Sequence, residues 1–162
     1  MIPNINNFNG KTVCECEGKT YYRWYPIQKH GDFQLKFRIV RTSSPYKQGI
    51  ALFFSDFKGL VFLNGKNLPI LKGKFKHYTF VQDQIKENEL TVSVHAECGS
   101  LVIGNASEIP GANYLECGAF GCAFWIENLN DSTCRFHCND HEYDDDFDDF
   151  IFELEIRSIE KA

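Results

Sequence analysis

Carboxylates gather at one point of the chain. Seven of the ten residues from Asp140 to Asp149 are acidic, and an alternating apolar stretch, "FIFELEI", follows at once. Such closely spaced anions repel one another, and a bound cation stabilises them. Ca²⁺ fits best because it takes about six to eight oxygen ligands in flexible geometry. We expect a calcium site with the ligands Asp140, Asp144, Asp145, Asp146, Asp148 and Asp149; the alternative is a solvated acidic loop.

The end of this acidic run carries a local resemblance. The segment "DDDFDDFIFELEI" (144–156) resembles the D-x-D-F/Y-N-D-hydrophobic-x-hydrophobic signature that ends several calcium-binding β-sandwich domains, among them bacterial surface domains and two-calcium jelly-roll lectins. Asp148 stands where those families usually have Asn. The resemblance implies that Asp144, Asp146, Asp148 and Asp149 bind Ca²⁺. In the lectins the ion also contacts sugar hydroxyls, so a carbohydrate ligand is implied as well.

Aromatic residues form a second candidate site in "TYYRWYPI" (20–27). In a strand, Tyr22 and Trp24 would share one face, which we expect to be core. The other face would carry Tyr21, Arg23 and Tyr25. Aromatic rings stack on the apolar faces of sugars, and tyrosine adds a hydroxyl group. We therefore expect these three residues to contact a carbohydrate or a protein.

Two further constellations indicate other chemistry. Cys134, His137, Cys138 and His141 supply four nitrogen and sulfur ligands, the number that Zn²⁺ takes, but their spacing is not a common zinc pattern. Glu153 and Glu155 lie two residues apart, and paired acids catalyse glycoside hydrolysis. The alternative for the two glutamates is the solvent face of a strand. No local motif of a hydrolase, a phosphate-binding loop or a zinc protease is present.

The elements that would position these residues are strands. Apolar and polar residues alternate in "DFQLKFRIV" (32–40), "ELTVSVHA" (89–96) and "FIFELEIR" (150–157). Asn64-Gly65 predicts a hairpin turn, "ECGS" (97–100) a tight turn between strands, and 82–88 a short helical turn. About nine or ten short strands indicate an all-β fold, an antiparallel jelly-roll-like β-sandwich, with residues 1–162 as one domain.

Composition narrows the function classes. The net charge is −5, but outside the acidic run 17 basic residues face 15 acidic ones. This balance disfavours nucleic acid and an anionic membrane surface as partners. No apolar run is long enough to span a membrane, and the first residues lack a signal-peptide pattern, so we expect a cytoplasmic protein; a trimmed secreted chain is the alternative. Seven cysteines, an odd number, argue for reduced thiols.

These observations predict a non-catalytic binding module that is stabilised by calcium, with carbohydrate as the ligand class. The main alternative is a metal-free structural or protein-interaction domain whose apolar surfaces form a homodimer or hold a partner. A third hypothesis is a small glycoside hydrolase that uses Glu153 and Glu155.

Overall fold

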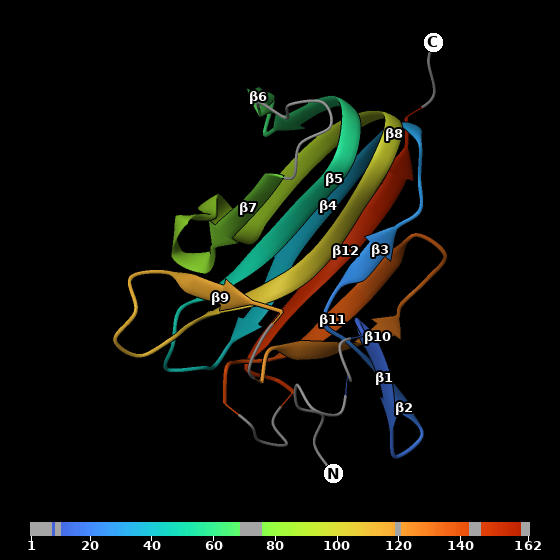
Figure 1. Cartoon of the computed structure of the whole chain (residues 1–162). Helices are drawn as coiled ribbons and strands as arrows, with labels where there is room; N and C mark the ends of the chain where they lie inside the picture. Colours follow the sequence, from blue (N-terminus) through green and yellow to red (C-terminus); the bar gives the residue numbers. More distant parts are fainter. Residues whose placement is uncertain (1–7, 9–10, 69–75, 119–120, 143–146, 160–162) are drawn as a thin grey trace.

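The computed structural model describes residues 8, 11–68, 76–118, 121–142 and 147–159, and almost all of its regular structure is strand (Figure 1). Two 3-10 turns, η1 (Gln82–Gln84) and η2 (Lys86–Asn88), lie where the sequence predicts a helical turn. The strands are β1 (Val13–Cys16), β2 (Lys19–Tyr22), β3 (Tyr25–Ile27), β4 (Gly31–Thr42), β5 (Gln48–Leu63), β6 (Lys66–Leu68), β7 (Lys76–Val81), β8 (Glu89–Glu108), β9 (Leu115–Cys117), β10 (Ala123–Asn128), β11 (Thr133–Asn139) and β12 (Phe150–Ser158).

Hydrogen bonds join the strands into one antiparallel sheet. Its order is β1-β2-β10-β11-β12-β4-β8-β5-β6, with β3 and β9 paired to β8 and β7 paired to β5. The predicted all-β class is therefore confirmed. The more specific jelly-roll sandwich stays a prediction, because the described strands form one bent sheet rather than two separate ones.

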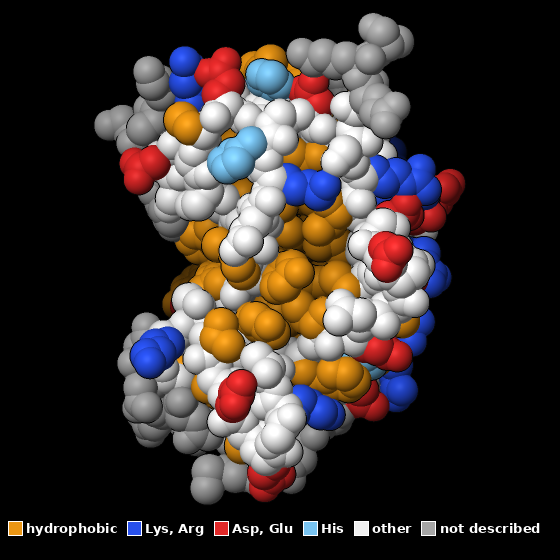
Figure 2. Space-filling view, turned by 90° about the vertical axis from the view of Figure 1, so that its right-hand side faces the viewer, with side chains coloured by type: hydrophobic (Ala, Val, Ile, Leu, Met, Phe, Trp, Pro, Cys, Tyr) orange, Lys and Arg blue, Asp and Glu red, His pale blue; other side chains and the backbone are white. Residues whose placement is uncertain are grey.

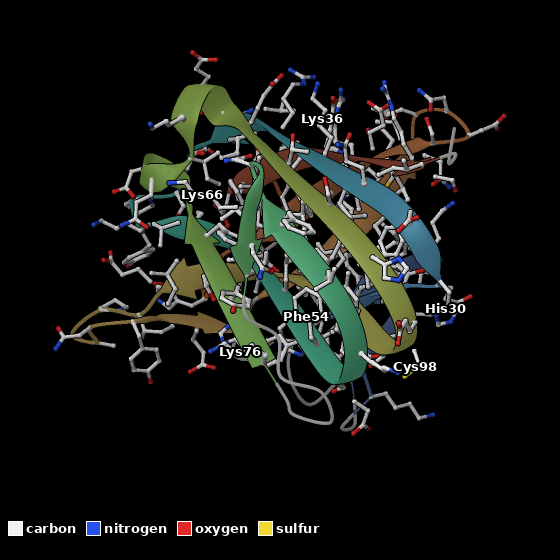
Figure 3. The ribbon with its side chains drawn as sticks, turned by 90° about the horizontal axis from the view of Figure 1, so that it is seen from above. His30, Lys36, Phe54, Lys66, Lys76 and Cys98 are labelled. Atoms are coloured by element: carbon white, nitrogen blue, oxygen red, sulfur yellow. The ribbon has the colours of Figure 1, made fainter. Side chains whose placement is uncertain are left out.

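The sheet bends where β5 and β8 change partners. The first part of β8 pairs with β4, and its second part pairs with β3 and β9. The β5–β8 register shifts around Lys58, and Figure 3 looks down on this region with Phe54 and Cys98 labelled. Gly99 has φ 99°, and a Cβ there would collide with the backbone of Asp56 and Phe57. The predicted turn at 97–100 is thus wrong: "ECGS" is a bend inside the single strand β8.

The core follows the alternation of the sequence. In β4, the side chains of Phe33, Leu35, Phe37 and Ile39 are buried, and β8 and β12 bury their alternating apolar residues in the same cluster. The hairpin turn at Asn64-Gly65 is also confirmed, because Leu63 pairs with Lys66 and both turn residues have positive φ. Within the described residues, no helix is long and apolar enough to cross a membrane.

Candidate functional site

The acidic segment connects β11 to β12, and its two ends are held together inside the protein. Asp140 and Asp149 are both buried. Asp149 Oδ2 accepts a hydrogen bond of 3.0 Å from the backbone N–H of Asp140. The carboxylate of Asp140 in turn accepts hydrogen bonds from the Ser44 hydroxyl, at 2.7 Å, and from the backbone N–H of Glu142, at 2.9 Å. Two of the six predicted calcium ligands therefore bind protein donors.

The remaining predicted ligands divide into two groups. Asp148 is partly exposed, and one of its carboxylate oxygens lies 3.6 Å from the Arg41 guanidinium. Asp144, Asp145 and Asp146 lie outside the described residues. Among the residues that are described, no three His, Cys, Asp or Glu side chains form a group that could hold a metal ion. Calcium binding therefore stays a prediction from the sequence.

The zinc alternative is not favoured by the geometry of β11. Cys134 and Cys138 are buried in the core. His137 belongs to the opposite face of the strand, where its ring stacks on Trp125 and its Nε2 lies 2.9 Å from a Glu127 carboxylate oxygen. Successive residues of a strand point to opposite sides, so the cysteines and His137 do not converge.

The predicted shared face of Tyr21, Arg23 and Tyr25 is wrong. Arg23 is buried, and its guanidinium donates a hydrogen bond of 2.7 Å to the carbonyl of Cys122. β2 ends at Tyr22 and β3 begins at Tyr25, so the two-residue alternation is interrupted between them. As a result, the rings of Tyr22 and Tyr25 lie edge to face with centroids 5.7 Å apart. Tyr21 instead contacts the ring of Phe147.

Tyr25 lies at the junction of two adjoining cavities, since both cavities have Tyr25 and Asn128 in their lining. We call them together the side cleft; their volumes are about 430 Å³ and 200 Å³. Figure 2 shows the face of the molecule that lies to the right in Figure 1, where hydrophobic side chains gather in a hollow between polar atoms. Strands β2, β3 and β10 and the β10–β11 turn form the walls. The residues that line the cleft include Lys19, Tyr22, Tyr25, Lys29, Trp125, Ile126, Asn128, Asn130, Asp131, Ser132, Thr133 and Ile156.

Polar groups line the rim of the side cleft beside its aromatic wall. The Asn130 side-chain oxygen accepts hydrogen bonds from the backbone N–H groups of Ser132 and Thr133, which fixes the β10–β11 turn. Asn128 is exposed, and its amide can donate and accept. Burial raises the pKa of Tyr25, so its phenol stays protonated and can donate a hydrogen bond. The cleft thus combines ring edges and faces with hydrogen-bonding groups, and the charged residues in its lining include Lys19, Lys29 and Asp131.

Trp125 belongs to this cleft although its neighbours in the sequence suggest a core position. Phe124 is fully buried, so the alternation of β10 places Trp125 on the opposite side of the strand. Its ring stacks on the His137 ring with centroids 4.0 Å apart, and Lys19 Nζ lies 4.1 Å from the ring centroid. The alternation of "AFWI" carries the signal that could have identified Trp125 as an outward residue.

The two glutamates of the hydrolase hypothesis are bound to arginines. Glu153 is held by Arg38 and Arg135, with the shortest N···O distances at 2.5 and 2.6 Å, and Glu155 pairs with Arg157. Burial tends to raise the pKa of Glu153, but the hydrogen bonds from Arg135 and Arg38 outweigh it and lower the pKa. A general acid needs a raised pKa. The ion pairs with arginine therefore favour a structural role for Glu153 and Glu155 on the sheet over a catalytic one.

Among the described residues, two contacts pair a histidine with a cysteine or a serine. Cys117 Sγ lies 3.7 Å from His77 Nε2, but burial raises the pKa of the Cys117 thiol to about 12 and lowers that of His77. The thiolate–imidazolium form is thus disfavoured. Ser107 Oγ lies 3.5 Å from His141 Nδ1, yet Ser107 is buried and accepts a hydrogen bond from Gln48. Neither pair therefore combines an accessible position with an activated nucleophile.

No protein-family model matches this chain, and searches of curated proteins and of solved structures give no significant match either.

Proposed function

We propose that the chain is a non-catalytic binding domain that takes a carbohydrate in the side cleft. The observation that carries this proposal is the pair of Tyr22 and Tyr25 rings, which meet edge to face in a cleft whose rim presents the exposed amide of Asn128. Sugars combine apolar C–H faces with a ring of hydroxyl groups. A cleft of aromatic carbon and polar donors and acceptors complements both.

The charges around the cleft also suit a neutral or weakly charged ligand. Lys19 lies over the Trp125 ring, and Lys29 donates a hydrogen bond of 2.8 Å to the Ser158 hydroxyl. Both ammonium groups are therefore engaged with the protein at the edge of the cleft. We propose calcium as a separate stabiliser of the acidic segment, because none of the described residues of that segment lines the side cleft.

A glycan array probed with the labelled protein tests the proposal. We expect saturable binding to a subset of glycans, and weaker binding by at least tenfold in Asn128→Ala and Tyr25→Ala variants. Matched controls are Asn67→Ala on β6 and Tyr114→Ala, which replaces an exposed tyrosine outside the cleft. Absence of glycan binding, or equal loss in the controls, contradicts the proposal.

A second candidate function is protein binding by strand addition. In the described part of the chain, β10 pairs with β2 only at Phe124 and Tyr22, whereas it pairs with β11 along its whole length. The edge from Trp125 to Asn128 can therefore accept an extended segment beside the aromatic cleft. A homodimer formed through this edge would appear as a concentration-dependent mass in sedimentation, and Trp125→Pro would abolish it.

A further inference from the structure

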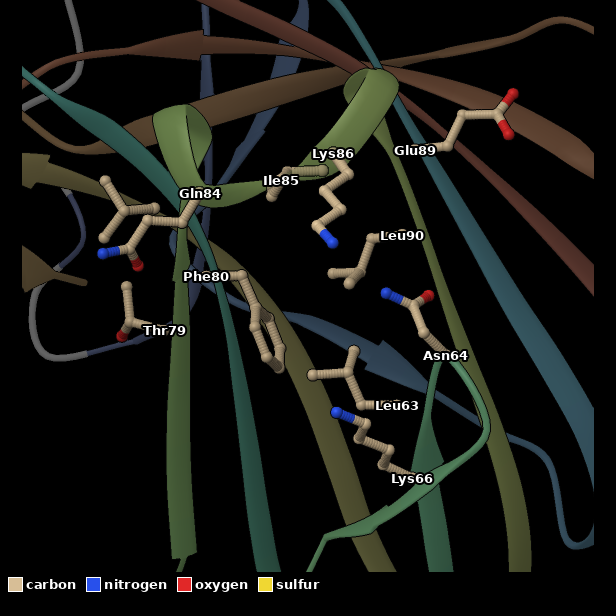
Figure 4. Close-up of a pocket in the computed structure, with 11 residues that line it drawn as sticks. Leu63, Asn64, Lys66, Thr79, Phe80, Gln84, Ile85, Lys86, Glu89 and Leu90 are labelled. Atoms are coloured by element: carbon tan, nitrogen blue, oxygen red, sulfur yellow. The ribbon is translucent and has the colours of Figure 1, made fainter.

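A cavity of about 480 Å³ lies away from the side cleft. The end of β5, the β5–β6 turn, the end of β7 and the two 3-10 turns surround it (Figure 4). Its wall contains the apolar side chains of Leu63, Phe80, Ile85 and Leu90. Leu90 is buried in the core, and the other three are partly buried and pack against it. The wall is therefore fixed by the core, so the cavity does not need a ligand to form.

Two lysines reach over this apolar wall from different elements. Lys66 follows the Asn64-Gly65 turn, and Lys86 belongs to η2. Figure 4 shows both side chains extending toward the middle of the cavity, while the Glu89 carboxylate points away from it. Among the described residues, neither lysine has a carboxylate oxygen within 4.0 Å, whereas Lys58 and Lys47 each pair with an acid. In the described part of the chain, the two ammonium groups thus face the cavity outside ion-pair distance of Glu89 or any other carboxylate.

Asn64 adds a hydrogen-bond donor at the same place. Its side-chain oxygen accepts a hydrogen bond of 3.0 Å from the backbone N–H of Thr91. The amide nitrogen is then directed to the cavity side, as Figure 4 shows. Asn64, Lys66 and Lys86 therefore supply three donors, from one hairpin and one 3-10 turn, to the same cavity, where they can bind an anionic head group.

We propose that this cavity binds a small amphiphilic carboxylate, with its head group between Lys66 and Lys86 and its hydrocarbon chain on Leu63, Phe80, Ile85 and Leu90. The apolar wall favours a hydrocarbon body over a purely polar anion such as inorganic phosphate. The site carries two lysines and one nearby glutamate, Glu89, so a single negative charge on the ligand is complementary. The cavity volume falls in the range of about 300–1,000 Å³ that small-molecule sites occupy.

Titration with octanoate, followed by ¹⁵N-resolved NMR below its critical micelle concentration, tests this assignment. We expect saturable shifts of the Asn64, Gly65 and Leu90 amide signals. Octanol, which lacks the charge, and acetate, which lacks the chain, should bind at least tenfold more weakly. Added salt should weaken octanoate binding because the head-group contacts are exposed ion pairs.

Variants separate a specific site from nonspecific adsorption. Lys66→Gln with Lys86→Gln should reduce octanoate affinity at least tenfold, while the control pair Lys11→Gln with Lys76→Gln removes the same charge outside the cavity and should bind as the unaltered protein does. Ile85→Ser should also weaken binding through the apolar wall. Equal binding by the two lysine pairs, or no saturable binding by the unaltered protein, would overturn the assignment. Glycan binding in the side cleft is measured separately, so the two proposals fail independently.

Discussion

Asp149 and Asp140 lie nine residues apart in sequence, and the Asp149 carboxylate accepts a hydrogen bond of 3.0 Å from the Asp140 backbone N–H. This contact closes the acidic segment at its base. Asp149 also offers its backbone carbonyl to the N–H groups of Ser43 and Ser44, which links the segment to the end of β4. The first and last acidic residues of the segment between β11 and β12, Asp140 and Asp149, therefore both form hydrogen bonds to other parts of the protein.

We expect Asp149→Ala to destabilise the fold by about 1–3 kcal/mol, because it leaves the buried N–H of Asp140 without its acceptor. Asp149→Asn should recover part of this loss, since an amide oxygen can accept the same bond. Chemical denaturation measures both free energies of unfolding. The exposed residue Asp131 supplies the control Asp131→Ala, which should stay within about 0.5 kcal/mol of the unaltered protein. An equally small effect for Asp149→Ala would contradict the structural role.

The calcium prediction is tested by thermal unfolding after treatment with EDTA. Added Ca²⁺ should raise the unfolding midpoint because an ion that binds only the folded state stabilises it by mass action. Asp148→Asn removes a predicted ligand charge and should reduce the rise, while Asp131→Asn should leave it unchanged. A flat response of the unaltered protein to Ca²⁺ would identify the segment as a solvated acidic loop.

Glu153 should make stability depend on pH. Its pKa is lowered in the folded state by Arg135 and Arg38, so its ionised form contributes stability above the unfolded-state pKa of about 4.3. This contribution is lost as the pH falls below that value through the lower folded-state pKa. Glu153→Gln should lose about 1–2 kcal/mol at neutral pH. The difference in the free energy of unfolding between the unaltered protein and Glu153→Gln should shrink on acidification from about pH 5 to pH 3. Urea denaturation measures it. A constant difference across this range would contradict the stabilising role of the ionised Glu153 carboxylate.

The cysteines should differ sharply in reactivity. Cys98 is exposed near the bend of β8, whereas Cys122, Cys134 and Cys138 are buried. Burial raises the pKa of Cys134 to about 11 and also raises the pKa of Cys122 and Cys138. A thiol reagent at pH 8 should therefore label Cys98 rapidly and these three only on unfolding. Mass spectrometry measures the labelling, and rapid modification of Cys138 in the folded protein would contradict the structure.

Local patterns predicted the strands well because a strand's alternation records which of its faces is buried. Phe33, Leu35 and Phe37 alternate with polar residues, and all three are buried in β4. The same reasoning failed at Arg23, whose burial depends on the carbonyl of Cys122, 99 residues away. A single sequence carries no local sign of that partner, so it could not show that the strand stops at Tyr22.

The candidate sites were harder to predict because each depends on strand order. Tyr25 reaches the side cleft since β3 pairs with β8 while β2 pairs with β10. The cavity beside Lys66 and Lys86 exists because β5, β7 and β8 are neighbours in the sheet. The residue types of Asn64-Gly65 predict the hairpin turn. They give no sign that Lys86, from η2, lines the same cavity as Lys66.

The most direct test of the proposed function is the affinity of one array-selected glycan for the unaltered protein and for Asn128→Ala, measured by isothermal titration calorimetry. Asn128 is exposed, so its replacement should leave the fold intact. We expect the affinity to fall at least tenfold, with no change for Asn67→Ala. An unchanged affinity for Asn128→Ala together with Tyr25→Ala, or no glycan that binds at all, would contradict carbohydrate binding in the side cleft.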